Sequence, residues 1–221
     1  MKTVRIIGSA RNVREVPVRT PEEQDIEVWL SNNTTTTLLR CPRMIDDWTR
    51  WFNLHSKAHI VGTYPSAWTY YAEKAAGRPI YLLRQQPDIP TSVAFPRKEI
   101  QAHFATAKGP NRYITCSVCW LIALATLEGF ERIELWGFEL RDTKPGSAFA
   151  WERPCFWYWV QEARRRGVDV WYQDAIHSLD AAGKLVAGDP DTYDGKLYGY
   201  STKPEVGWCM KHEEFGCCPQ A

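Results

Sequence analysis

The sequence predicts an α/β fold: a single doubly wound, mostly parallel sheet with an extended C-terminal tail rich in aromatic residues and cysteine. Short apolar segments of strand length alternate along the chain with longer segments of helical length. This alternation is typical of a Rossmann-like arrangement, in which helices cover both faces of a parallel sheet. With 221 residues, 44% of them hydrophobic, the chain can bury such a core. We expect about five to seven strands in a domain over residues 1–183, followed by a tail over residues 184–221.

Six segments are predicted to be strands, because each is short and apolar and runs into polar or glycine residues. They are residues 4–7, 26–30, 50–54, 79–83, 133–136 and 168–172. In open parallel sheets, ligands bind outside the carboxyl ends of the strands. The loops that follow these segments are therefore the candidate ligand site.

The segments of helical length are residues 65–77, 97–107, 118–128 and 151–166, with a short helical turn around residues 176–181. Pro65 and Gly77 mark the first of these, since proline favours the first turn of a helix and glycine the position just after its end. Thr115 or Ser117 could cap the third helix. The segment that precedes the second helix is rich in proline and glutamine and is predicted to be a loop (residues 85–96).

Composition and motifs argue against several classes of protein. Lys and Arg (27) almost balance Asp and Glu (26), whereas dedicated nucleic-acid binders carry a basic excess. No apolar run approaches the roughly 18 residues that cross a bilayer, and the first residues lack a signal-peptide pattern. We therefore expect no membrane partner, a cytoplasmic location and cysteines that are thiols. The lack of G-x-G-x-x-G and G-x-x-x-x-G-K-[ST] argues against NAD-dependent and P-loop chemistry.

Polar residues after the first, second and fifth predicted strands are candidate nucleotide contacts. Asparagine both donates and accepts hydrogen bonds, which suits a base or a ribose, although it is equally typical of an ordinary turn. Glu139 could hold a ribose hydroxyl or a metal ion, and Arg153 could neutralise a phosphate; both could also be solvated surface charges. The nucleotide-binding candidates are Gly8, Ser9, Arg11, Asn12, Asn32, Asn33, Ser117, Gly137, Glu139 and Arg153.

Two histidines and a cysteine pair complete the candidates for chemistry within the predicted domain. His55 follows the third strand and His177 the last, so either could serve as a catalytic base at the same edge of the sheet. The alternative for both is a solvated histidine in a loop. Cys116 and Cys119 form a C-x-x-C at the apolar start of a helix and are predicted to be buried core thiols.

The tail carries four residues that could hold zinc tetrahedrally: Cys209, His212, Cys217 and Cys218. Their spacing matches no standard zinc module, so we assign no metal site and no certain cofactor. The tail also holds several tyrosines and a tryptophan but few aliphatic residues. We expect it to form an extended arm that packs on the domain, on a second copy of the chain or on a virion partner.

One block of the sequence resembles a recurrent block of the bacterial sialyltransferases of the Campylobacter type and of the related motility-accessory and archaeal pterin-diphosphokinase-like proteins. Residues 114–118 read I-T-C-S-V, an alanine-rich helix follows, and residues 129–139 read G-F-E-R-I-E-L-W-G-F-E. The turn at residues 8–12 is similar to the G-[NS]-G-P-S opening of that family, and residues 28–32 are similar to its second strand. By this resemblance Asn32 contacts a nucleotide.

The same layout is similar to that of small phage-encoded proteins, including the Arg153-Pro154 helix start and the Tyr198-Gly199-Tyr200 segment. Together these likenesses cover about residues 1–180 and imply a Rossmann-type fold, a nucleotide-linked donor and a phage origin.

The chain departs from the family at four places. Ala10 and Arg11 replace the Gly-Pro of the opening, and Glu139 replaces an aspartate. Cys116 stands where the sialyltransferases have the serine that meets the carboxylate of the donor. Their catalytic histidine lies in a long lid, whereas residues 142–150 here are short and contain no histidine. These departures argue against a sialyl donor but not against a nucleotide.

The sequence thus predicts a nucleotide-dependent transferase, a glycosyltransferase-like protein that uses a nucleotide-sugar donor and an unidentified acceptor. One alternative is a non-catalytic, phage-encoded nucleotide-binding protein on the same fold, and another is a structural or interaction protein. A diphosphokinase-like enzyme, which would need magnesium and ATP, is a further alternative. A base within reach of the acceptor would distinguish an enzyme from a binding protein.

Overall fold

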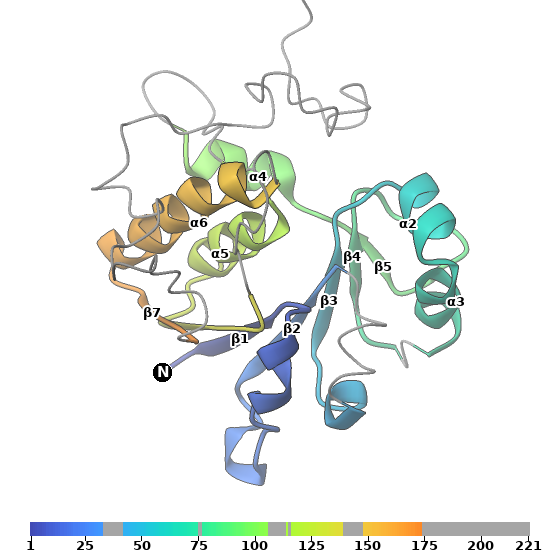
Figure 1. Ribbon diagram of the computed structural model, residues 1–221, viewed down its shortest axis with the longest axis horizontal. Helices are drawn as coiled ribbons and strands as arrows, with labels where there is room; N and C mark the ends of the chain where they lie inside the picture. The colour runs from blue at the N-terminus through green and yellow to red at the C-terminus, as the bar shows by residue number, and fades with distance from the viewer. Residues whose placement is uncertain (33–41, 75–76, 106–113, 115, 139–147, 174–221) are drawn as a thin grey trace, which may run out of the picture.

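The computed structural model describes residues 1–32, 42–74, 77–105, 114, 116–138 and 148–173 (Figure 1). Strands from these residues form one seven-stranded sheet in which every neighbouring pair is parallel. They are β1 (Thr3–Ile7), β2 (Glu27–Ser31), β3 (Arg50–Asn53), β4 (Ile80–Leu82), β5 (Ser92–Ala94), β6 (Arg132–Trp136) and β7 (Asp169–Tyr172). The predicted doubly wound, Rossmann-like α/β fold is confirmed.

The order of the strands is β5-β4-β3-β2-β1-β6-β7. The chain adds β2 to β5 one after another on one side of β1 and then returns to place β6 and β7 on the other side. The direction of winding therefore reverses between β1 and β6, and such reversal points are where open α/β sheets usually bind ligands. All the strands are parallel, so their carboxyl ends lie along one edge of the sheet.

The helices divide between the two faces of the sheet (Figure 1). Helices α4 (Arg97–His103), α5 (Ser117–Leu127) and α6 (Ala148–Arg165) cover one face, and α2 (Lys57–Thr63) and α3 (Pro65–Lys74) cover the other. The short 3-10 helices η1 (Arg11–Glu15), η2 (Pro21–Glu23) and η3 (Pro42–Ile45) complete the elements of the described residues.

Each face of the sheet has its own hydrophobic core, because successive side chains of a strand point to opposite faces. In β2, Trp29 packs under α5 and α6, whereas Val28 and Leu30 join the core beneath α2 and α3. Helix α5 is apolar around its whole circumference and buries residues 118–125, since the sheet, α4 and α6 all pack against it.

Two elements differ from the sequence prediction. Strand β5 lies inside residues 85–96, which we predicted to be a loop, and α2 was not predicted at all. Both are too short to show a periodic pattern: β5 has three residues, two of them exposed, and α2 has seven residues, of which only Ile60 is buried. In addition, the N-cap of α5 is Cys116, so Ser117 is the first helical residue and not the cap.

The predicted helical turn at residues 176–181 and the tail at residues 184–221 lie outside the described residues. Within the part of the chain that is described, no helix combines the length and the apolar character that crossing a membrane requires.

Candidate functional site

The carboxyl edge of the sheet brings together several of the residues singled out in the sequence. Gly8 and Ser9 follow β1, Asn32 follows β2, His55 lies two residues beyond β3, and Gly137 follows β6. Ser117 begins α5 and is half-buried. The remaining candidates are not placed: Asn33, Glu139 and His177 lie outside the described residues, as do the side chains of Arg11, Asn12 and Arg153.

Between β1 and β6, where the direction of winding reverses, the loop after β1 is hydrogen-bonded to the end of β6 and to the loop that follows it. The backbone N–H of Gly8 donates to the carbonyl of Trp136 (2.8 Å), and that of Ala10 donates to the carbonyl of Gly137 (2.8 Å). A Cβ at Gly8 would lie 2.4 Å from the Gly137 carbonyl oxygen and 2.8 Å from the ring of Phe138. The glycine therefore permits close packing of protein on protein at this point.

Asn32 has a structural position at the end of β2. Its φ of 50° lies in the left-handed region, which asparagine tolerates better than most residues. Its backbone N–H donates to the carbonyl of Phe52 (2.7 Å), and its own carbonyl accepts from the hydroxyl of Tyr71 (3.5 Å). The Asn53 amide donates to the same hydroxyl (3.0 Å). These bonds tie the ends of β2 and β3 to α3.

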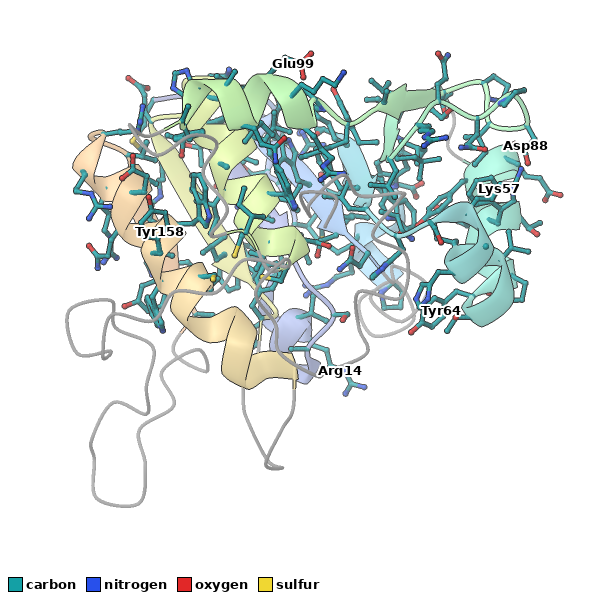
Figure 2. All side chains as sticks on the ribbon, turned by 90° about the horizontal axis from the view of Figure 1, so that it is seen from above. Arg14, Lys57, Tyr64, Asp88, Glu99 and Tyr158 are labelled. Atoms are coloured by element: carbon teal, nitrogen blue, oxygen red, sulfur yellow. The ribbon has the colours of Figure 1, made fainter. Side chains whose placement is uncertain are left out.

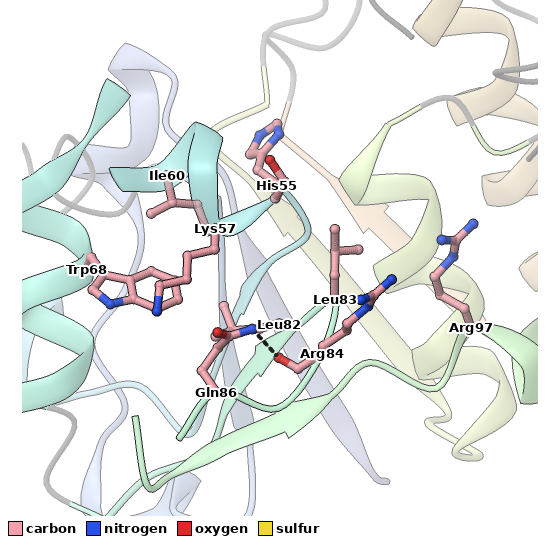
Figure 3. Close-up of a pocket in the computed structure, with 10 residues that line it drawn as sticks. His55, Lys57, Ile60, Trp68, Leu82, Leu83, Arg84, Gln86 and Arg97 are labelled. Carbon is pink, nitrogen blue, oxygen red and sulfur yellow. Dashed lines mark hydrogen bonds between the residues drawn. The ribbon is translucent and has the colours of Figure 1, made fainter. Parts of the chain in front are cut away.

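A cavity of about 190 Å³ opens farther along the same edge, over the carboxyl ends of β3, β4 and β5 (Figure 3). The ten residues that line it come from the loop after β3, from α2 and α3, from the end of β4 and its loop, and from the start of α4. They are His55, Ser56, Lys57, Ile60, Trp68, Leu82, Leu83, Arg84, Gln86 and Arg97. Among the predicted site residues that the structure describes, His55 is the one that lines this cavity.

One wall of the cavity is a polar cluster around Trp68 (Figure 3). The Lys57 ammonium forms an ion pair with Asp88 (2.9 Å) and lies 4.7 Å from the centre of the Trp68 ring. The indole N–H of Trp68 donates to the same Asp88 oxygen (2.9 Å). These hydrogen bonds, that of Lys57 first, lower the pKa of Asp88. Figure 2 shows Lys57 and Asp88 together at the α2 end of the molecule.

Two arginines lie on the opposite side of the cavity from Trp68 (Figure 3). The Arg97 guanidinium packs over the ring of Trp120, at 5.3 Å from its centre. Arg84 is exposed, and its guanidinium forms no hydrogen bond or ion pair with any residue that the structure describes. None of the ten lining residues carries a carboxylate, and because Lys57 is ion-paired with Asp88, the positive charge of the lining comes from Arg84 and Arg97.

His55 lies at the margin of the cavity, next to α2. Burial, and secondarily the like charge of His59, lower its pKa from 6.5 to about 4. The two imidazole rings are 4.6 Å apart between centres. The backbone N–H of His55 donates to the Asn53 side chain (3.4 Å), which holds the loop against the end of β3. At neutral pH the ring is therefore uncharged, and a neutral imidazole can accept a proton.

The cationic residues of this cavity were not among the residues predicted from the sequence. Lys57, Arg84 and Arg97 follow the ends of β3, β4 and β5 by four, two and three residues. A cation shortly after each of three strands is a pattern that the sequence contains, but the pattern of three can be recognised only if β5 is predicted as a strand. Without β5, Arg97 belongs to no strand end.

Comparisons of the chain with protein-family models, with curated proteins and with solved structures found no match. The likeness to the sialyltransferase and diphosphokinase-like proteins therefore stays a prediction from the sequence.

Proposed function

We propose that the protein binds a phosphorylated ligand, a nucleotide or nucleotide sugar, in the cavity over β3, β4 and β5, and that it transfers a group from this ligand. The observation that carries the proposal is the pair of arginines, Arg84 and Arg97, after the ends of two neighbouring strands, around a cavity whose described lining residues include no carboxylate. Guanidinium groups match phosphate oxygens in both charge and geometry.

The size of the cavity favours partial enclosure of such a ligand. Its volume of about 190 Å³ is smaller than the 300–1,000 Å³ of most small-molecule sites. We expect the phosphates to lie between Arg84 and Arg97 and a base or sugar ring to pack toward Trp68, with the rest of the ligand outside. The Lys57–Asp88 pair holds the Trp68 ring in place, because the Asp88 carboxylate binds both the Lys57 ammonium and the indole N–H.

His55 is the base in this proposal. Before a ligand binds, its pKa of about 4 makes it a weak base. A bound phosphate would add negative charge beside the imidazole, and an opposite charge nearby favours the protonated form. Ligand binding would therefore raise the pKa of His55 toward neutrality, where a base is most effective in taking a proton from an acceptor hydroxyl.

The low pKa of His55 before ligand binding also favours a second candidate function, a nucleotide-binding protein without turnover. In that case the same residues bind the ligand and no acceptor is needed.

Calorimetry with nucleoside mono- and diphosphates and nucleotide sugars tests the binding step. We expect Arg84→Gln to weaken binding by about 10- to 150-fold, the value of one charge-assisted hydrogen bond to a phosphate. Lys98→Gln is the matched control, since Lys98 is an exposed cation on α4 outside the cavity lining. Absence of binding, or equal affinity of the parent and Arg84→Gln, would reject the proposal.

A second arm separates the enzyme from the binding protein. If the protein is a transferase, His55→Gln should keep the affinity for the nucleotide and lower turnover by about 10²–10⁴-fold. Hydrolysis of the nucleotide sugar to the free nucleotide is a suitable readout, because water can replace the unidentified acceptor. Binding without any turnover in the parent would leave the non-catalytic function.

A further inference from the structure

The cysteine pair Cys116 and Cys119 takes no part in the proposed function. Both thiols are buried, as the sequence predicted. Cys116 is the N-cap of α5, with an extended backbone, and Cys119 is the third residue of that helix. The C-x-x-C spacing therefore places one thiol just before the first turn of α5 and the other within it.

The two sulfur atoms lie against each other. Their Sγ–Sγ distance is 3.2 Å, which is the contact of two thiols. A disulfide bond is about 2.05 Å long, so the sulfurs have to approach by roughly 1.2 Å to form one. Side-chain rotation of a residue at a helix end can supply a movement of this size, because Cys116 precedes the regular part of α5.

The two thiols also differ in their access to solvent. Cys116 keeps 8% of its surface exposed, whereas Cys119 is completely buried. Cys155, on the neighbouring helix α6, is also completely buried. A pair in which one thiol is partly accessible and the other is not can react in sequence: the more accessible thiol reacts with the oxidant, and the second thiol then displaces the bound group.

We propose that Cys116 and Cys119 are a redox-active dithiol, which low-molecular-weight disulfides oxidise to an intramolecular disulfide. The Cys116 thiolate attacks one sulfur of the small disulfide, forms a mixed disulfide and releases one small thiol. The Cys119 thiolate then attacks the Cys116 sulfur and releases the second small thiol. Two protein thiols are oxidised, one small disulfide is reduced to two thiols, and the two protons of the cysteines pass to the departing thiolates.

Peptide mapping tests this reaction directly. The full-length protein is incubated without oxygen in mixtures of oxidised and reduced glutathione, quenched with acid, alkylated and digested with trypsin. Residues 113–132 form one tryptic peptide that contains both cysteines and no other. With excess oxidised glutathione we expect this peptide to lose two hydrogen atoms and both alkylation sites. Dithiothreitol should restore them.

Serine variants define the order of the steps. Cys119→Ser should accumulate a glutathione mixed disulfide on Cys116, and Cys116→Ser should show neither product. Cys155→Ser is the matched control, since it removes a buried thiol of the same core and should give the same disulfide as the parent. If a variant fails to fold, the peptide map of the parent still decides.

Three results would overturn the proposal. The first is a peptide that keeps both free thiols under excess oxidised glutathione while the protein stays folded by circular dichroism. The second is a mixed disulfide on Cys116 that Cys119 never resolves in the parent. The third is a bond from either cysteine to Cys155.

Discussion

At the scale of single residues, the environment of His55 determines its chemistry. The ring is half-buried at the end of β3 and lies beside a second imidazole, and both features disfavour the protonated form. The sequence places a histidine after a strand, but it does not show that α2 follows at once and brings His59 alongside. The folded protein therefore keeps His55 neutral at pH values where an unfolded chain would protonate it.

This difference predicts a pH-dependent loss of stability. The pKa of His55 falls from an ordinary histidine value of 6.5, expected for the unfolded chain, to about 4 in the folded protein. The unfolded chain therefore binds more protons between these values. Stability falls as the pH drops from 6.5 toward 4, by at most about 2 kcal/mol between pH 7 and pH 5. That corresponds to roughly 4–8 °C in Tm for a domain of this size.

Thermal melts at pH 7 and pH 5 measure the effect. His55→Gln should reduce the drop in Tm over this interval, whereas His103→Gln, an exposed histidine on α4 outside the cavity lining, should keep the drop of the parent. Equal drops in all three proteins would contradict the prediction. Carboxylates with lowered pKa values, such as Glu23 and Asp88, lose their stabilising effect at lower pH and do not contribute here.

At the scale of elements, the sequence predicted six of the seven strands because a strand buried on both faces is rich in apolar residues, as in β2, where Val28, Trp29 and Leu30 follow one another. The same reasoning could not find β5 or α2, whose stability comes from their neighbours. In β5, Ser92 supports the strand by accepting from the backbone of Gln86 and donating back to it. Both missed elements border the cavity, so Lys57, which begins α2, and Arg97, which follows β5, were missed with them.

The contact between the loops after β1 and β6 gives a prediction at this scale. Gly8→Ala would place a methyl group 2.4 Å from the Gly137 carbonyl oxygen, where backbone has to move. We expect a loss of about 1–3 kcal/mol in the free energy of unfolding, the usual cost of overpacking. Urea denaturation measures it.

Gly62→Ala is the matched control for this substitution. Gly62 lies in helix α2, and a Cβ there would meet nothing within 4 Å. Because alanine favours a helix over glycine, the free energy of unfolding should rise by about 0.5–1 kcal/mol. Equal stabilities of Gly8→Ala and the parent would show that the loops after β1 and β6 can separate at little cost.

At the scale of the whole molecule, the described residues, which end at residue 173, form two hydrophobic cores. The sheet separates a core under α4, α5 and α6 from one under α2 and α3. The largest fully buried side chains are tryptophans of both cores: Trp29, Trp48, Trp51 and Trp159. The high tryptophan content of the chain, which could have indicated interfaces, thus serves internal packing to a large extent.

Since the described domain has its own cores, removal of residues 188–221 should leave a folded protein. These residues lie outside the described part of the chain, and the expectation for them rests on composition: they hold Tyr193, Tyr198, Tyr200, Trp208 and Phe215. Burial of several aromatic side chains on the domain or on a second copy would offset the entropy lost when the tail becomes ordered.

The truncated chain should then melt about 2–8 °C lower than the full chain, as a loss of about 1–2 kcal/mol predicts, or sediment as a smaller species. Melting and sedimentation should be measured at equal molar concentration, because dimer dissociation alone would shift both. A truncated protein that melts at the parent temperature and keeps the parent oligomeric state would contradict the prediction, because a packed tail cannot be removed without losing the contacts it makes.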